Sequence, residues 1–161
     1  MRPVEQFDTL VVGGGAAGLM AAGMAVSLGK SVCLFDKNKV LGRKVRITGK
    51  GRCNVTNNCP VEEVVAACPR GGKFLYGALS AFSPADTMAF FQELGVPLKT
   101  ERGRRVFPQS DSAHDIANAL ERWAKDAQVV REPVNQVLTE NGRVVGVKTP
   151  QGTYHGRSVI L

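Results

Sequence analysis

The chain has 161 residues, of which 43% are hydrophobic and 22% charged, a composition that supports one folded domain and excludes a disordered chain. Its formal net charge is +7, but only 6% of its residues are aromatic. We interpret the cations as dispersed and not interleaved with aromatic rings, with the acidic complement lying outside this sequence. Nucleic acid is therefore an unlikely partner on composition alone.

The four cysteines, Cys33, Cys53, Cys59 and Cys68, form no C-x-x-C pair, and the two histidines stand alone. This spacing predicts neither a metal site nor a disulfide framework. The first residues lack the apolar core of a signal peptide, and no apolar run is long enough to cross a bilayer. We therefore expect a cytoplasmic protein with no membrane partner.

The first elements in chain order form a βαβ unit. A short apolar run at 7–12 predicts a buried parallel strand, and the Ala-, Leu- and Met-rich run 16–28 predicts a helix ended by Gly29. A second buried strand at 31–35 is closed by Asp36. This unit is the strongest local signal in the sequence.

The remaining elements are less regular. Residues 37–58 form a long glycine-punctuated loop, of the kind that is usually functional, and short helices are predicted at 61–67 and 73–81. Ser83 with Pro84 begins a further helix ended by Gly95, residues 98–107 are expected to be extended, and Ser110 or Asp111 caps the next helix. A third parallel strand is predicted at 128–131.

The last part of the chain predicts a β-meander at about 134–157. Strands at 134–138 and 144–148 flank an Asn141-Gly142 turn, and another strand follows at 153–155. The apolar residues 158–161 predict a separate buried strand, whose abrupt end suggests that the sequence is truncated.

The glycine pattern Gly13-x-Gly15-x-x-Gly18 stands between the first strand and the first helix. Gly13 permits the tight turn, Gly15 lets a pyrophosphate approach the backbone, and Gly18 seats the helix on the strand, with Gly14 as the variable position. Asp36 ends the second strand, where its carboxylate accepts hydrogen bonds from a ribose and disfavours a 2′-phosphate. The alternative is a structural glycine turn beside a surface aspartate.

Several segments together resemble one family. They are the glycine turn, Leu41-Gly42-Arg43-Lys44, Thr48-Gly49-x-Gly51-Arg52-Cys53-Asn54 and Arg105-Val106-Phe107-Pro108. The whole chain is similar to the HI0933-like flavoproteins of the YhiN and BaiN type, which are bacterial NAD(P)- and FAD-dependent oxidoreductases. Lys50 stands where the family pattern has a small residue.

This resemblance implies an α/β fold. It has three layers, a Rossmann-like arrangement that binds FAD or NAD(P), a parallel central sheet and a β-meander, and it is truncated before an inserted domain. Residues 1–161 would be the N-terminal part of an FAD-binding domain, with residues 37–58 as a glycine-rich cofactor loop. The cofactor would be FAD and the electron donor NAD(P)H, with a small organic molecule as the substrate.

The resemblance also implies which residues contact the cofactor. These are Gly13, Gly15, Ala16, Ala17 and Gly18 at the pyrophosphate, Asp36 at the ribose, Lys37 and Val130 at the adenine end, Arg43 and Lys44 along the cofactor, and Gly49, Gly51, Arg52, Cys53 and Asn54 nearer the flavin. No catalytic residue is implied.

Alternatives remain for individual residues and for the whole chain. Cys53 is either a redox-active thiol beside Arg52 or a small buried side chain, and we favour the second. Arg102, Arg104 and Arg105 are interpreted as a solvated face, and His114 as an exposed helix residue. The alternatives to the oxidoreductase are an FAD-dependent RNA-modifying protein and a non-catalytic remnant.

Overall fold

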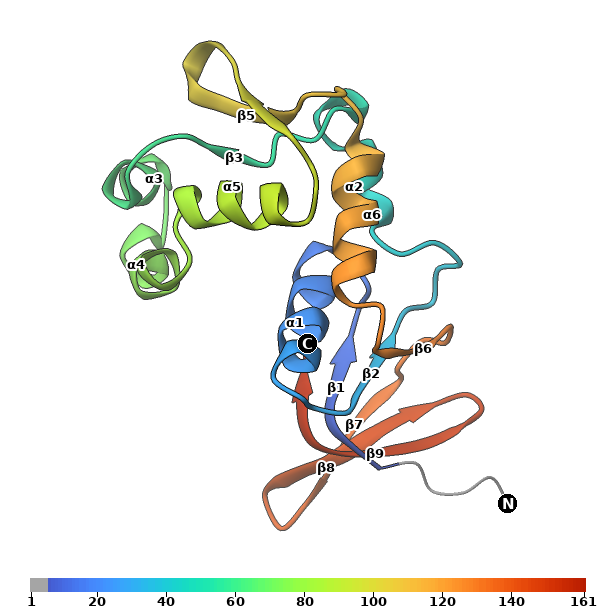
Figure 1. The fold of residues 1–161 in the computed structure, drawn as a ribbon. Helices are drawn as coiled ribbons and strands as arrows, with labels where there is room; N and C mark the ends of the chain where they lie inside the picture. The colour runs from blue at the N-terminus through green and yellow to red at the C-terminus, as the bar shows by residue number, and fades with distance from the viewer. Residues whose placement is uncertain (1–5) are drawn as a thin grey trace. The chain divides into compact units, whose positions relative to one another are not determined.

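The computed structural model describes residues 6–161 of the chain and shows an α/β fold. The chain divides into two compact units (Figure 1). The first contains the chain up to Lys44 together with Leu120–Leu161, and the second is Val45–Ala119. The division falls inside α2 (Arg43–Ile47) and near the end of α6 (Ala113–Trp123).

The first unit begins with the βαβ arrangement that the sequence predicts. β1 (Gln6–Val12) runs parallel to β2 (Val32–Phe35), and α1 (Ala16–Ser27) connects them. Gly29 follows the helix with φ +72°, a left-handed conformation that glycine adopts readily. The strand β6 (Gln128–Val130) lies parallel to β2, which confirms the predicted third strand.

The meander continues the same sheet. β7 (Gln136–Glu140), β8 (Arg143–Thr149) and β9 (Gly152–Ile160) follow one another, and the strand order is β6-β2-β1-β9-β8-β7. Asn141 and Gly142 both have positive φ, as the predicted tight hairpin turn requires.

One prediction for this region is wrong. Residues 153–155 and 158–161 were expected to form two strands, but β9 is continuous, antiparallel to β8 in its first half and parallel to β1 beyond it. Ile160 and Leu161 are exposed rather than buried. The continuity depends on pairing with β1, from which β9 is separated by almost the whole chain, so local periodicity does not reveal it.

The core of the first unit has two faces. On one face Leu10, Cys33, Phe35 and Val147 form a buried cluster, and the Tyr154 ring meets the Phe35 ring edge-on at 4.9 Å. On the other face α1 packs so closely that a Cβ on Gly18 would lie in contact with Val11. α1 therefore covers one face of the parallel strands, and side chains of the meander pack against the other face.

The second unit contains short helices and a small antiparallel sheet. The helices α3 (Val61–Ala67), α4 (Gly72–Ala81) and α5 (Pro84–Glu93) lie close to the predicted ranges. α5 begins with a capping box in which Ser83 and Asp86 exchange hydrogen bonds. The sheet has the order β3-β5-β4, with β3 at Thr56–Asn57, β4 at Leu98–Thr100 and β5 at Arg105–Pro108.

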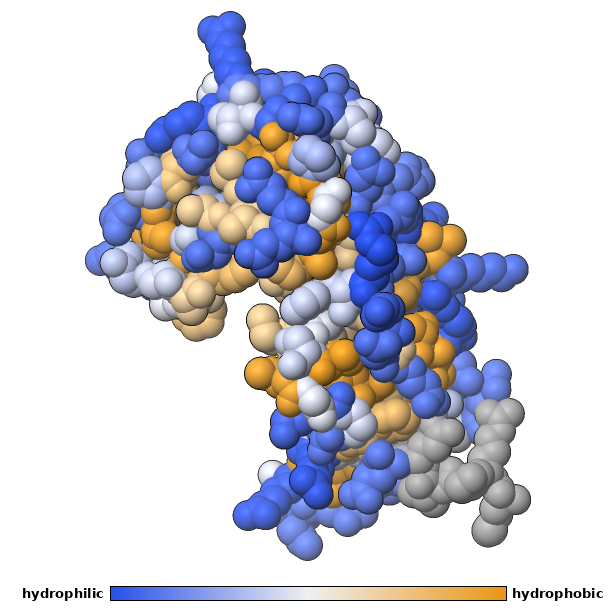
Figure 2. Space-filling view, in the orientation of Figure 1, coloured by the Kyte–Doolittle hydropathy of each residue, from blue (hydrophilic) through white to orange (hydrophobic). Residues whose placement is uncertain are grey.

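Two details of this unit differ from expectation. The extended stretch 98–107 is a hairpin, because a 3₁₀ turn at Arg102–Arg104, with Gly103 at φ +74°, reverses the chain between β4 and β5. α4 leaves large apolar side chains at the surface: Phe74 is 89% exposed, Tyr76 49% and Leu75 40%. Figure 2 shows orange, hydrophobic residues at the surface among the hydrophilic blue ones.

Candidate cofactor site

The glycine turn leads from β1 into α1 at the carboxyl end of the parallel strands. Gly13 has φ +105°, and a Cβ on Gly18 would lie less than 3.0 Å from the Gly13 carbonyl oxygen. Gly15 caps α1 without a side-chain hydrogen bond, and no atom lies within 4 Å of the place where its Cβ would be. The first N–H groups of α1, at Ala16 and Ala17, therefore face open space at the positive end of the helix dipole.

Gly14, the variable position of the motif, is tightly packed in this chain. A Cβ there would lie less than 3.0 Å from the Leu41 side chain and from Asp36 Oδ2. The Gly14 N–H donates to Asp36 Oδ2 at 2.7 Å, and the Gly14 carbonyl accepts from the Gly42 N–H at 2.7 Å. The glycine turn is thus fastened to the end of β2 and to the loop that follows it.

The Asp36 carboxylate accepts several of the hydrogen bonds in this region. Its Oδ1 accepts hydrogen bonds from the backbone N–H and the side-chain amide of Asn38, at 2.7 and 2.8 Å. Together with the bond from Gly14, these use three of the roughly four acceptor positions of a carboxylate. The carboxylate keeps acceptor capacity for a ribose hydroxyl, but it has a structural role that the sequence did not indicate.

Val130 and Lys37 lie on either side of Asp36. The Asp36 N–H donates to the Val130 carbonyl at 3.0 Å, and the half-buried Val130 side chain packs against the core cluster. Lys37 is exposed. The next residue, Asn38, accepts a hydrogen bond at its carbonyl from the Arg131 guanidinium at 3.2 Å. The structure therefore brings the predicted adenosine-end residues, Gly13 to Gly18, Asp36, Lys37 and Val130, to one edge of one unit.

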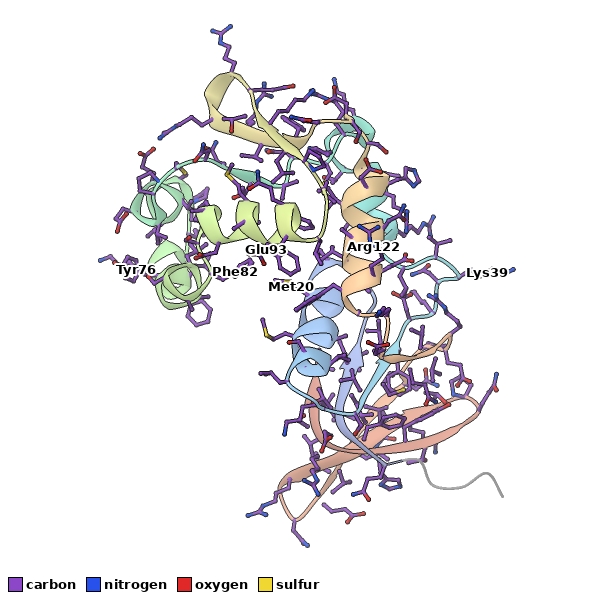
Figure 3. All side chains as sticks on the ribbon, in the orientation of Figure 1. Met20, Lys39, Tyr76, Phe82, Glu93 and Arg122 are labelled. Carbon is purple, nitrogen blue, oxygen red and sulfur yellow. The ribbon has the colours of Figure 1, made fainter. Side chains whose placement is uncertain are left out.

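The basic residues are not dispersed, contrary to our interpretation of the composition. Seven of the 21 Lys and Arg residues fall between positions 37 and 52, a stretch with no Asp or Glu: Lys37, Lys39, Arg43, Lys44, Arg46, Lys50 and Arg52. Arg43 and Lys44 begin α2 and are exposed, and Lys39 extends away from the ribbon in Figure 3. Among residues 6–161, no ion pair forms at Lys37, Lys39, Arg43, Lys44 or Lys50.

In the second unit, the predicted flavin-side residues form a strained turn. Gly49, Lys50, Gly51 and Cys53 all have positive φ, between +57° and +82°. Lys50 and Cys53 are not glycines, and each left-handed non-glycine residue costs about 1 kcal/mol or more. The Lys50 position explains the small residue of the family pattern, since glycine adopts this conformation without strain.

Arg52 is held in a cluster of charges. Its guanidinium donates to Glu101 Oε1 at 2.5 Å and to Asp111 Oδ1 at 2.5 and 2.9 Å, and it lies 4.3 Å from the centre of the Phe107 ring. Lys99 Nζ completes the cluster, 2.7 Å from Asp111 and 3.5 Å from Glu101. Lys99 and Glu101 were not singled out from the sequence, and Asp111 was considered only as a helix cap, because β4 and the loop before α6 reach Arg52 only in the folded unit.

The pKa values follow from these contacts. The hydrogen bonds to Glu101 and Asp111 raise the pKa of Arg52. The bond from Arg52 lowers the pKa of Glu101, and the bonds from Lys99 and Arg52 lower the pKa of Asp111. The cluster is therefore fully charged over the neutral range.

Cys53 and Asn54 end the turn, the first buried and the second exposed. Cys53 is buried, and burial raises the pKa of its thiol, which favours the structural interpretation over a reactive thiolate. The Asn54 amide, oriented so that its nitrogen faces two carbonyls, donates to Thr56 at 2.9 Å and Val106 at 3.2 Å. Both residues therefore support the turn through its packing.

The other singled-out basic residues have ordinary surface roles. Arg104 forms an ion pair with Glu63, and Arg105 donates to the Arg102 carbonyl at 3.1 Å. His114 is exposed near the start of α6, as predicted, and its ring nitrogen lies 3.0 Å from the Arg46 guanidinium. No group of three or more metal-ligating side chains gathers in residues 6–161, and no helix within that range is both long and apolar enough to span a membrane.

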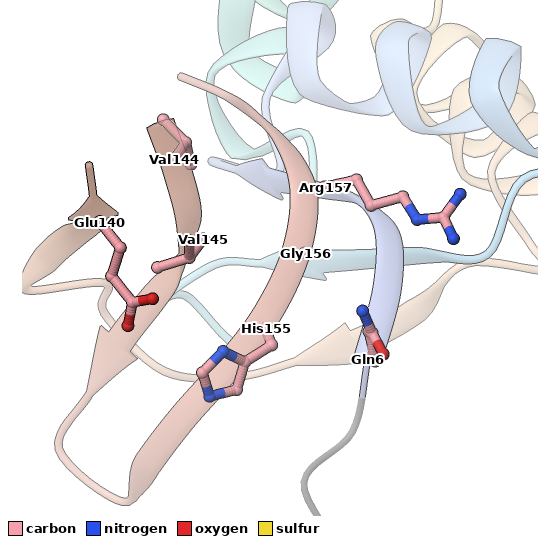
Figure 4. Close-up of a pocket in the computed structure, with 7 residues that line it drawn as sticks. All are labelled: Gln6, Glu140, Val144, Val145, His155, Gly156 and Arg157. Atoms are coloured by element: carbon pink, nitrogen blue, oxygen red, sulfur yellow. The ribbon is translucent and has the colours of Figure 1, made fainter. Parts of the chain in front are cut away.

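A pocket opens elsewhere on the first unit (Figure 4). It is lined by Gln6, Glu140, Val144, Val145, His155, Gly156 and Arg157. Gln6 begins β1, so the pocket lies at the amino end of that strand, about 20 Å along it from the glycine turn. Ligands of open α/β sheets bind at the opposite, carboxyl edge, so we do not assign this pocket to the cofactor.

The parallel sheet, its crossover helix and the glycine turn define a Rossmann-type domain. The chain belongs to the family described as the HI0933-like protein Rossmann domain, whose sequence profile matches residues 7–161. This confirms the family that the sequence motifs indicate.

Two characterised relatives are similar in sequence. The 3-dehydro-bile acid delta(4,6)-reductase of Clostridium scindens is 36% identical over 115 residues, 69% of this chain and 27% of that protein. The ribosomal RNA dihydrouridine synthase of Escherichia coli is 32% identical over 136 residues, 84% of this chain and 33% of that protein. The chain thus spans between a quarter and a third of the length of these relatives.

The fold recurs in a solved structure of low sequence identity. The 3-ketosteroid-delta4-(5alpha)-dehydrogenase from Rhodococcus jostii RHA1 superposes with a TM-score of 0.75 at 15% identity, covering 97% of this chain and 45% of that one. At this identity the likeness establishes the fold alone.

Proposed function

We propose that this chain is the FAD-binding portion of a flavin-dependent oxidoreductase that transfers hydride between NAD(P)H and a small organic substrate. The observation that carries the proposal is the uncapped N-terminus of α1, which opens over Gly15 beside the Asp36 carboxylate. The open position accommodates a pyrophosphate, and the carboxylate accepts from an unmodified ribose. Bound FAD would supply the hydride chemistry.

Each part of the chain has a role in holding that cofactor. The N–H groups of Ala16, Ala17 and Gly18 would donate to the pyrophosphate, and Asp36 would accept from the ribose, with Lys37 and Val130 beside the adenine. Arg43 and Lys44 would balance negative charge along the cofactor. Gly49, Gly51, Arg52, Cys53 and Asn54 would support the flavin side.

The relatives suggest the class of bond that is reduced. The names of both relatives, a delta(4,6)-reductase and a dihydrouridine synthase, describe the addition of hydrogen across a carbon–carbon double bond. We propose that the substrate of this protein likewise carries a carbon–carbon double bond activated by a neighbouring carbonyl group. We also propose a cytoplasmic setting, since no disulfide forms between the cysteines of residues 6–161.

The test is a cofactor titration of the purified chain. We expect the fluorescence of FAD to be quenched when it binds. ADP should compete with FAD, because ADP carries the adenosine and pyrophosphate that the first unit would hold. FMN, which lacks the adenosine, should compete poorly. Absence of FAD binding at millimolar concentration would refute the proposal, and anaerobic reduction by NADH or NADPH would identify the donor.

A second candidate function is an FAD-dependent RNA-modifying protein. It is favoured by the concentration of cations between positions 37 and 52, which exceeds what the pyrophosphate of one dinucleotide can balance. It is also favoured by the similarity to a ribosomal RNA dihydrouridine synthase over 84% of the chain.

Salt-dependent RNA binding distinguishes the two candidates. An RNA-modifying protein should bind single-stranded RNA with an affinity that falls steeply with salt, by a slope of about 0.7 per phosphate contact. Removing two cations, in Lys39→Gln with Lys50→Gln, should lower that slope by about 1.4, whereas Lys148→Gln on β8 should leave it unchanged. No binding at low salt would leave the small-molecule oxidoreductase as the function.

A further inference from the structure

The turn from Gly49 to Cys53 needs support from outside itself. Four of its five residues have positive φ, and only two of those four are glycine. Within the turn, the Arg52 N–H donates to Gly49 and the Cys53 N–H donates to Thr48, each at 3.1 Å. Strained conformations of this kind persist only where surrounding contacts determine them.

Arg52 supplies the main contact with the surroundings. Its side chain reaches three other parts of the second unit: Glu101 after β4, Asp111 before α6 and the Phe107 ring on β5. Glu101 and Asp111 both accept from Nη2, and Asp111 also accepts from Nε, so two nitrogen atoms of the planar guanidinium are held and its orientation is fixed as well as its position.

The same contacts neutralise Arg52. The cluster contains two cations, Arg52 and Lys99, and two carboxylates, Glu101 and Asp111, all within 3.5 Å of an opposite charge. A guanidinium balanced in this way contributes little net charge to a neighbouring ligand. Its evident effect is on the shape of the turn.

We propose that Glu101 and Asp111 are positioning residues, which hold Arg52 so that the strained turn keeps the conformation that contacts the flavin cofactor. This inference rests on the proposed FAD-binding function. It assigns to Arg52 the role of a clamp rather than that of a charge partner of the flavin.

The experiment compares Glu101→Gln, Asp111→Asn and their double variant with a matched control, Glu63→Gln. The control breaks the exposed ion pair with Arg104 in the same unit without touching Arg52. We expect the double variant to increase amide hydrogen exchange at residues 48–54 about tenfold and to weaken FAD binding about tenfold, with the thermal midpoint nearly unchanged. The control should change neither quantity by more than about twofold.

Arg52→Lys separates shape from charge. Lysine keeps the positive charge but cannot make the forked contact with two carboxylates. If Arg52 acts as a clamp, the Arg52→Lys variant should behave like the double variant. If Arg52 is a charge partner of the flavin, the Arg52→Lys variant should bind FAD normally, and this result would overturn the proposal.

Two other results would overturn it. One is unchanged exchange at residues 48–54 in the double variant, and the other is faster exchange with unchanged FAD affinity. If the unaltered chain binds no FAD, the proposed function fails, and the exchange measurement alone then decides whether the carboxylates position the turn.

Discussion

At the scale of single residues, Lys50 shows a conflict between side chain and backbone. It has φ +57° in a turn where both neighbours are glycines. Lys50→Gly removes the cost of a left-handed lysine but increases the entropy of the unfolded chain, so we expect a net gain of about 0.5–1 kcal/mol in the free energy of unfolding. Denaturant titration measures this gain.

Lys50→Ala is the control for that prediction. Alanine removes the amine but keeps a Cβ in the left-handed region, so the free energy of unfolding should stay within about 0.5 kcal/mol of the original value. Equal stabilisation by alanine and glycine would show that charge, and not backbone strain, is relieved.

Cys53 is the second residue whose environment decides its chemistry. Because burial raises the pKa of its thiol, little thiolate forms at neutral pH. We expect Cys53 to react with iodoacetamide at least about tenfold more slowly than the half-buried Cys59 and Cys68, as measured by peptide mass spectrometry of the folded chain. Comparable rates for the three would restore the redox-active interpretation.

At the scale of elements, α1 contains a glycine that the helix itself does not require. A Cβ on Gly23 would lie less than 3.0 Å from the Trp123 ring of α6. Gly→Ala inside a helix normally stabilises by about 1 kcal/mol, but here the rigid indole has to move, so we expect Gly23→Ala to destabilise the chain by about 1–3 kcal/mol.

Gly77 in α4 is the matched control, since no atom lies within 4 Å of its Cβ position. Gly77→Ala should stabilise by up to about 1 kcal/mol. If thermal unfolding shows the same effect for both variants, Gly23 is not required for the contact with Trp123.

The Arg52 cluster makes a prediction about acid. Glu101 and Asp111 have lowered pKa values in the folded chain, so the stability that they add is complete above the ordinary carboxyl range and is lost as the pH falls through their folded values. The NMR signals of Gly49 and Gly51 should therefore change with a midpoint below that of an ordinary, unpaired carboxyl group. A midpoint in the ordinary carboxyl range or above it would contradict the lowered pKa values.

The elements also show why some features could be predicted from the sequence. The βαβ unit is encoded locally by an apolar strand, a glycine turn and a helix ended by Gly29, so its boundaries are correct to within a residue or so. The packing of Gly14 against Asp36 joins residues 22 positions apart, and Arg52 contacts Glu101 and Asp111 at separations of 49 and 59 positions. No local pattern in the sequence contains that information.

At the scale of the whole molecule, burial is unevenly distributed. Leu10, Leu19, Cys33 and Leu34 are fully buried in the first unit, whereas Gly72 is the only buried residue of α4. We expect amides of β1 and β2 to exchange most slowly and those of α4 to exchange far faster, as measured by hydrogen exchange with mass spectrometry. Equal protection of α4 would show that its apolar surface is covered in solution.

The pairing of β9 with β1 has a consequence for biosynthesis. β1 is hydrogen-bonded to β9, which the ribosome makes much later, since Gln6 lies opposite His155. At translation rates of about 5–20 residues per second, β1 waits roughly 7–30 s for this neighbour. During that interval one edge of an apolar strand is open to other nascent chains, which makes the emerging polypeptide a natural client of ribosome-associated chaperones.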